Sequence, residues 1–116
     1  MGKMSRDKGK RGEAEVAHLL KSYGYEAKRG CQYHGGPDSP DVTGIDGLHI
    51  EVKRVERLDL DAAMEQSIRD AGEDMPVVMH RRSRKPWKVT LLLDDFMRLW
   101  GDREHGRTEK DQVHKC

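Results

Sequence analysis

A short segment near the middle of the chain carries residues that could hold a divalent cation. Residues 37–53 read PDSPDVTGIDGLHIEVK, with Asp41 before a glycine-containing turn and Glu51 and Lys53 after it. The residues after the turn alternate between apolar and polar, the period of a half-buried strand, so Glu51 and Lys53 share one face. Carboxylates and a carbonyl are hard oxygen ligands of the kind that Mg²⁺ prefers. We therefore interpret Asp41, Glu51 and the Val52 carbonyl as metal ligands, and Lys53 as the group that orients a bound water or stabilises charge on a phosphate.

The register of the expected hairpin 41–52 decides whether the two carboxylates can meet. A two-residue turn at its tip puts Asp41 and Glu51 on opposite faces of the sheet. A three-residue loop, 45–47, ending in a left-handed glycine sets Asp41 opposite Glu51 and puts both on one face. A bulge at Gly44 has the same effect. The alternative to a metal site is a charge pair of Glu51 with the nearby lysine on a solvated strand face.

The rest of the chain predicts a sheet with helices beside it. Helices over 11–23 and 61–71 carry apolar residues at helical spacing, and a glycine follows each of them. Strands are expected at 25–30, 41–45, 48–54, 76–80 and 88–93, and a short last helix at 95–100. The order α-β-β-β-α-β-β-α predicts an α/β fold, a mixed central sheet flanked by helices. We expect residues 1–100 to form a single domain and residues 101–116 to form a polar, flexible tail.

Charge is distributed unevenly along the 116 residues, of which 37% are charged and 5% aromatic. The formal net charge is only +1, yet residues 3–11 and 81–88 are basic and residues 56–74 are mostly acidic. Separate basic blocks can hold a polyanion locally, although solubilising charge is the simpler explanation for either block alone.

The apolar runs and the cysteines exclude several classes. No apolar run reaches the length of a membrane span, so we expect no membrane. The two cysteines, Cys31 and Cys116, lie far apart in the sequence, which favours a reducing, cytoplasmic location. Cys31 and His34 lack the second pair of ligands that a zinc site needs.

Several motifs in one order resemble a known family. The segment KGKRGEAEVAHLLKSYGYEAKR, followed by PDV and IEVK, is similar to the PD-(D/E)xK nuclease superfamily, over roughly residues 8–100. Within it, the chain most resembles archaeal-type Holliday junction resolvases and their phage-borne relatives. The resemblance implies a restriction-endonuclease-like fold and hydrolysis of DNA phosphodiesters with Mg²⁺, for which Mn²⁺ would substitute. It also implies that Asp41 and Glu51 are metal ligands, that Lys53 is the catalytic lysine, and that Glu13 is a first-helix acid that binds the metal directly or through water.

The same resemblance implies how DNA is held. Arg29 matches a basic residue that faces a phosphate, and Gln66 matches a glutamine that some of these nucleases place near the site. Together with the basic blocks, this gives a set of expected DNA contacts: Lys8, Lys10, Arg11, Arg29, Arg81, Arg82, Arg84 and Lys85. A homodimer is expected, because two strands require two sites. Two features depart from the resolvases: Ala14 stands where they often have arginine, and the second helix lacks the aromatic residues that they use in dimer packing.

Several alternatives stay open at this stage. Glu15 competes with Glu13 as the helix acid, and Asp38 competes with Asp41 as the motif aspartate. The default for His34 and His49 is a surface position, although His49 shares the strand face with Glu51. Trp87 could stack on a base or pack on the core. The alternatives for function are another nuclease of the same fold, acting on ends, nicks or single strands, and an inactive nucleic-acid-binding module.

Overall fold

The computed structural model describes the backbone of residues 2–30 and 39–115 and the side chains of residues 8–30 and 39–105. The zinc and motif alternatives at Cys31, His34 and Asp38, and the last residue, Cys116, lie outside the described residues. Within the described part, no helix is both long enough and apolar enough to cross a membrane.

A five-stranded mixed sheet forms the centre of the molecule. Its strands are β1 (Lys28–Arg29), β2 (Val42–Thr43), β3 (Leu48–Arg54), β4 (Met75–Arg81) and β5 (Lys88–Thr90), and they lie side by side in chain order. The β3–β4 pair is parallel and the other pairs are antiparallel. The parallel pair needs a crossover, which α3 (Leu60–Ala71) supplies. The expected element order and the mixed α/β fold are confirmed.

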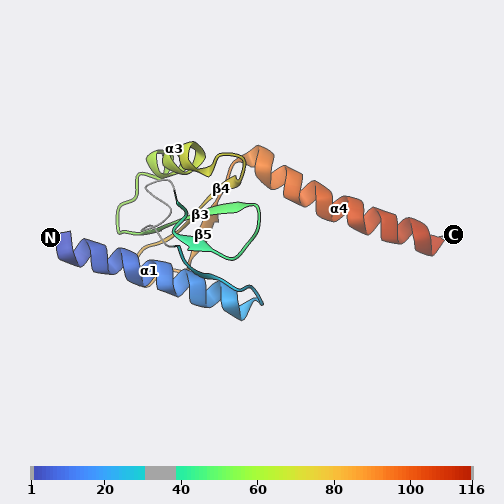
Figure 1. Ribbon diagram of the computed structural model, residues 1–116. Coiled ribbons are helices and arrows are strands. Elements are labelled where there is room, and N and C mark those ends of the chain that lie inside the picture. The colour runs from blue at the N-terminus through green and yellow to red at the C-terminus, as the bar shows by residue number, and fades with distance from the viewer. Residues whose placement is uncertain (1, 31–38, 116) are drawn as a thin grey trace.

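Helices cover both faces of the sheet (Figure 1). On one face, Val16 and Ala17 of α1 (Gly2–Ser22) pack with Ile50 and Val52 of β3 in the larger apolar cluster. On the other face, α3 packs Ala63 and Met64 against Val78 of β4 in a smaller cluster. Since side chains alternate along β3, His49, Glu51 and Lys53 point to the α3 side. The candidate site residues of β3 therefore lie between the sheet and a helix.

Helix α3 has the bounds that its flanking residues predict. The side chain of Asp59 accepts a hydrogen bond from the Ala62 N–H at 3.0 Å, an N-cap, and Gly72 follows the helix with φ of 60°. The expected start at residue 61 differs from the observed one by a single residue. Local capping signals were sufficient here, because Asp59 and Gly72 act on their own helix.

Other bounds differ from the expectation. Helix α1 begins at Gly2 rather than near residue 11, and α4 (Leu93–Lys115) continues far past the expected end at residue 100. Strands β1 and β5 are shorter than expected. Both long helices lack proline and are rich in lysine, arginine and glutamate, which have high helix propensity. This propensity explains why the backbone is helical even in segments that have few apolar residues to pack.

Helix α1 approaches β3 closely at Gly12. A Cβ atom at Gly12 would lie only 3.0 Å from the Arg54 Cβ, which is closer than an ordinary van der Waals contact. The absence of a side chain at Gly12 therefore allows the helix to pack this close to the strand. Gly12 is buried and lies one turn before the core residues Val16 and Ala17, whereas Ala14 is exposed. The close approach at Gly12 brings the neighbouring, partly buried Glu13 to the sheet.

Candidate active site

The hairpin adopts the register that brings the two motif carboxylates together. Val42 pairs with Ile50, so the preceding Asp41 lies opposite Glu51. The turn uses two glycines at positive φ, Gly44 at 120° and Gly47 at 86°. Since Val42 and Ile50 both belong to the α1-side core, Asp41 and Glu51 share the other face. Of the two registers considered, the three-residue loop or bulge describes the structure, and the two-residue turn is excluded.

Both carboxylates are buried, and burial changes their chemistry. Asp41 is 9% exposed and Glu51 is 4% exposed. Burial raises the pKa of Glu51 from 4.5 to about 8, and the charge of Asp41 and a hydrogen bond between the two carboxyls act in the same direction. The nearby charge of Lys53 lowers this pKa, while that of Asp70 raises it. Glu51 therefore lies within reach of both neighbours, and the alternative of a solvated charge pair is wrong.

His49 holds one oxygen of Glu51. Its Nε2 lies 2.9 Å from Glu51 Oε1, and the side chains of both residues are almost completely buried. When Glu51 is ionised its oxygens only accept, so Nε2 must then carry the proton that is donated. The default surface position for His49 is wrong. Its place on the strand face with Glu51 was visible in the period-two pattern, but burial of that face by α3 was not.

Asp41 is fixed by backbone contacts from both sides. Its Oδ2 accepts a hydrogen bond from the Val52 N–H at 2.9 Å, and its carbonyl accepts one from the Gly30 N–H at 2.7 Å. A Cβ at Gly30 would collide with the Pro40 carbonyl, so glycine is needed for this close approach. Because the N–H and C=O of one strand residue point to the same edge, the Val52 carbonyl also points towards Asp41. Its role as a ligand stays a prediction.

Glu13 reaches the same neighbourhood from α1. Its Oε2 accepts a hydrogen bond from Arg29 Nε at 3.0 Å. Burial raises the pKa of Glu13, the Arg29 bond lowers it, and the charge of Asp41 raises it. Asp41 therefore acts on both Glu13 and Glu51. Glu15, the competing helix acid, instead binds Arg81 at 2.9 Å, away from these carboxylates.

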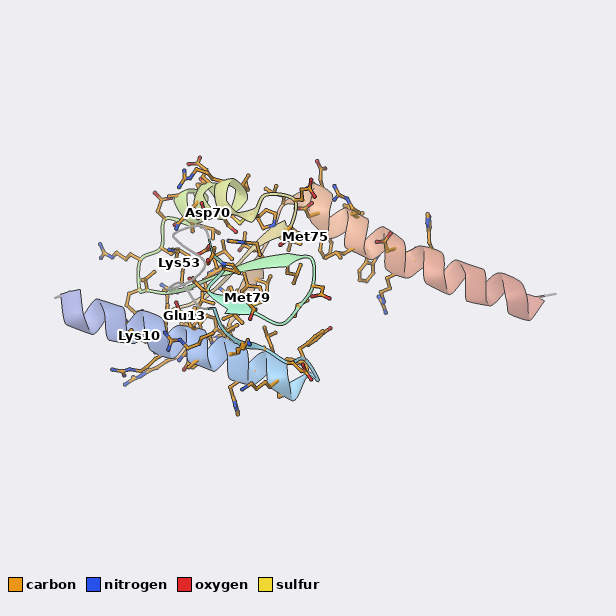
Figure 2. All side chains as sticks on the ribbon, in the orientation of Figure 1. Lys10, Glu13, Lys53, Asp70, Met75 and Met79 are labelled. Carbon is orange, nitrogen blue, oxygen red and sulfur yellow. The ribbon has the colours of Figure 1, made fainter. Side chains whose placement is uncertain are left out.

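Helix α3 contributes the other wall of the site. Figure 2 shows Lys53 between Glu13 on α1 and Asp70 on α3, in agreement with the influence of Lys53 and Asp70 on the pKa of Glu51. Asp70 is a site neighbour that the sequence pattern missed, since nothing local to residue 70 marks it. Gln66 is partly buried one turn earlier on α3, and its expected place near the site stays a prediction.

The donor set fits a hard cation. The site offers two adjacent buried carboxylates whose like charges repel each other, one carbonyl aimed at them and a neighbouring third carboxylate. These are the oxygen ligands that a Mg²⁺-type ion uses together with waters. The raised pKa of Glu51 reflects negative charge that a cation would compensate. Among residues 8–30 and 39–105, however, no group of three or more His, Cys, Asp or Glu side chains is already arranged to hold a metal ion. Glu51 and Glu13 are turned towards His49 and Arg29, so a cation would recruit them by side-chain rotation.

The expected DNA-contacting residues fall into two groups. Lys10, Arg11, Arg82, Arg84 and Lys85 are exposed. Arg81 is engaged within the protein: it bonds Glu15 through two nitrogens, donates to the Lys85 carbonyl, and lies over Trp87 at 5.6 Å from the ring centroid. Trp87 itself packs against the α1-side core. The guanidinium of Arg81 thus holds the loop to α1, and its contact with DNA stays a prediction.

Comparison with known proteins places the fold. No protein-family model and no curated protein sequence matches the chain. Among solved structures, Hjc of Archaeoglobus fulgidus, a Holliday junction resolvase from an archaeal hyperthermophile, matches with a TM-score of 0.53 and 25% identity. The match covers 70% of this chain and 73% of that one. The chain has a resolvase-like nuclease fold. The restriction-endonuclease-like architecture expected from the motifs is therefore confirmed.

Proposed function

We propose that the chain is a metal-dependent DNA endonuclease of the PD-(D/E)xK type, acting on branched or duplex DNA as a Holliday junction resolvase does. The observation that carries the proposal is the pairing of Asp41 opposite Glu51, buried together beside Lys53. The similarity to Hjc supports the same chemistry. We further propose that it works in the cytoplasm.

The residues of the site divide the chemistry between them. Asp41, Glu51 and the Val52 carbonyl would hold Mg²⁺, or Mn²⁺ in its place, with Glu13 joining directly or through a water. The ion supplies a Lewis acid for a phosphate oxygen and lowers the pKa of a bound water. Lys53 orients the attacking water or stabilises the charge that builds on the phosphate. The water oxygen would bond to phosphorus and release one proton to solvent. The bond from phosphorus to the leaving sugar oxygen would break, and that oxygen would take up one proton from solvent.

DNA phosphates would be held by exposed cations on two elements. Lys10 and Arg11 are exposed on α1, and the charge of Lys10 acts on Glu13. Arg82, Arg84 and Lys85 are exposed in the loop before β5. Lys8 is partly used, since its Nζ lies 3.8 Å from Glu56. Such contacts position the backbone and carry little sequence information. Arg29 would have two roles: its hydrogen bond would position Glu13, and its charge would contact a DNA phosphate.

A second copy of the chain is proposed to complete the enzyme. Helix α4 runs away from the sheet, as Figure 1 shows. Leu92 and the first turns of α4 expose an apolar strip with side chains between 42% and 73% exposed: Leu92, Leu93, Phe96, Met97, Leu99 and Trp100. A strip of this kind on a projecting helix supports the proposal of an interface with a second copy. A two-fold dimer through α4 would give two sites for two strands.

One experiment tests the function. The protein is incubated with Mg²⁺ and four DNA forms: a four-way junction, a duplex, a nicked duplex and a single strand, with Asp41→Asn as the control. We expect the junction or the duplex to be cut by the native chain only. Cleavage confined to nicks or single strands would favour another nuclease of this fold. Binding without any cleavage would favour an inactive module.

A further inference from the structure

A basic cleft lies beside the candidate active site. Its volume is about 390 Å³, within the range of small-molecule sites, and it is formed by the segment after β3, the end of β4 and the loop before β5. Four exposed cations line it: Arg57, Arg82, Lys85 and Lys88. The only carboxylate among its lining residues is that of Glu56.

The cleft is held open by the protein's own contacts. The Glu56 carboxylate accepts hydrogen bonds from the Ser83 N–H, at 3.1 Å to each oxygen, which ties the two loops together. Arg81 donates to the Lys85 carbonyl at 3.3 Å and fixes the turn between them. Glu56 and Arg81 are engaged in this way, so Arg57, Arg82, Lys85 and Lys88 supply the remaining charged side chains of the cleft lining.

One residue of the cleft lining is the strand neighbour of Lys53, the proposed catalytic lysine. His80 lines the cleft and is the register partner of Lys53 across the parallel β3–β4 pair. Neighbouring strands lie about 4.8 Å apart, and paired residues point to the same face. Burial and the charge of Lys88 both lower the pKa of His80, so both disfavour its charged form. The arginines and lysines of the lining carry the positive charge of the cleft.

The walls suit a sugar as well as a phosphate. Leu58 and Pro86 add apolar surface, so the lining of the cleft combines cations with apolar side chains. A DNA strand leaving Lys53 presents this combination: a deoxyribose followed by the next phosphate. We propose that the cleft binds the sugar and phosphate of the nucleotide next to the scissile phosphate on that side of the cut. The inference rests on the proposed function, because it takes Lys53 as the point of cleavage.

The test asks whether the loss of affinity caused by neutralising one DNA phosphate depends on the cations of the cleft. Junction and duplex substrates carry a single neutral methylphosphonate, moved one position at a time away from the cut. Binding is measured in EDTA, so that metal and cleavage play no part. In the native chain, neutralising the flanking phosphate on one side should weaken binding by about fivefold, the contribution of one such charge contact.

The variants decide whether the cleft is responsible. In the double variant Arg82→Gln, Lys85→Gln, the same methylphosphonate should cause no further loss, and the slope of log affinity against log salt should fall by about 0.9 for each contact removed. Arg84→Gln is the matched control, because Arg84 lies in the same loop and is exposed but does not line the cleft. Since Arg84 is itself a proposed contact to another phosphate, this variant should lower overall DNA affinity without changing the coupling. It should keep the full fivefold effect of the methylphosphonate.

The possible outcomes distinguish a failure of the cleft proposal from a failure of the proposed nuclease function. If every methylphosphonate weakens the double variant as much as the native chain, or if Arg84→Gln removes the coupling equally, the cleft is not the phosphate site. If either result is found while the native chain still cuts DNA with Mg²⁺, the cleft proposal fails and the proposed nuclease function is retained. Coupling without any cleavage would keep the cleft as a phosphate-binding site, but it would overturn the endonuclease and with it the place of that phosphate next to a cut. A native chain that binds no DNA would overturn both proposals.

Discussion

Removing the buried Glu51 charge should stabilise the metal-free protein in a pH-dependent way. Burial raises the pKa of Glu51 in the folded state to about 8, whereas the unfolded chain keeps the usual value of 4.5. As pH rises above 4.5 the unfolded chain releases this proton and the folded chain retains it. The free energy of unfolding therefore falls between about pH 4.5 and pH 8, and then levels off. Glu51→Gln, which has no such proton, lacks this decline.

The size of the effect follows from the pKa difference. A shift from 4.5 to about 8 corresponds to at most about 5 kcal/mol of lost stability by pH 8. Water entry and small adjustments of the site raise the effective dielectric constant, so we expect about 2 to 3 kcal/mol. A domain of this size is stabilised by only about 5 to 15 kcal/mol, so the difference is readily measured.

Urea denaturation at pH 5 and pH 8 in EDTA measures the difference directly. The stability of Glu51→Gln relative to the native chain should rise by about 2 to 3 kcal/mol between these pH values. Glu65→Gln, at an exposed position of α3, should give a constant difference. Adding Mg²⁺ at pH 8 should stabilise the native chain and reduce the difference in free energy of unfolding between it and Glu51→Gln. A Glu51→Gln difference as flat as that of Glu65→Gln would refute the burial argument.

Four further outcomes are expected. Asp41→Asn should abolish cleavage but keep DNA affinity in EDTA, measured by electrophoretic mobility; Mg²⁺-dependent cutting by this variant would remove Asp41 from the site. Lys53→Ala should lower the single-turnover rate about 10²- to 10³-fold with Mn²⁺ affinity nearly unchanged, whereas a negligible loss would reduce Lys53 to a passive neighbour. His49→Leu should weaken Mn²⁺ binding, followed by electron paramagnetic resonance, about 10- to 100-fold, and His49→Gln should restore part of it; equal affinity in all three proteins would show that His49 does not orient Glu51. Met97→Glu should give a monomer by analytical ultracentrifugation at micromolar concentration, and a native chain that is itself monomeric would exclude the α4 dimer.

The sequence predicted those features that depend on neighbouring residues. The alternation of residues 48–53 and the glycines of the turn were enough to define the two possible registers, and the caps at Asp59 and Gly72 were enough to bound α3. Each of these signals acts within a few residues of the structure it specifies. The choice between the registers was not local, since it depends on which face the two helices bury.

The features that the sequence did not reveal are contacts between distant elements. Arg81 and Glu15 are 66 positions apart, so no spacing rule connects them, and Arg81 looked like any other residue of a basic loop. Asp70 carries no motif of its own and becomes a site neighbour only because α3 crosses the sheet beside Glu51. The long α4 helix was missed for a different reason: the polar composition of residues 101–115 was given more weight than their helix propensity.

The two buried acids explain why the site is built on the sheet rather than on a loop. Placing Asp41 and Glu51 side by side costs stability, since burial and repulsion both oppose ionisation. The cost is sustained because Asp41 is held by the Val52 N–H and Glu51 by His49, on a strand paired along its whole length to β4. A flexible loop would relieve the same repulsion by moving apart. The rigid strands instead keep the two carboxylates together, so their ionisation is unfavourable without a nearby positive charge. We propose that a divalent cation bound beside Lys53 supplies that charge.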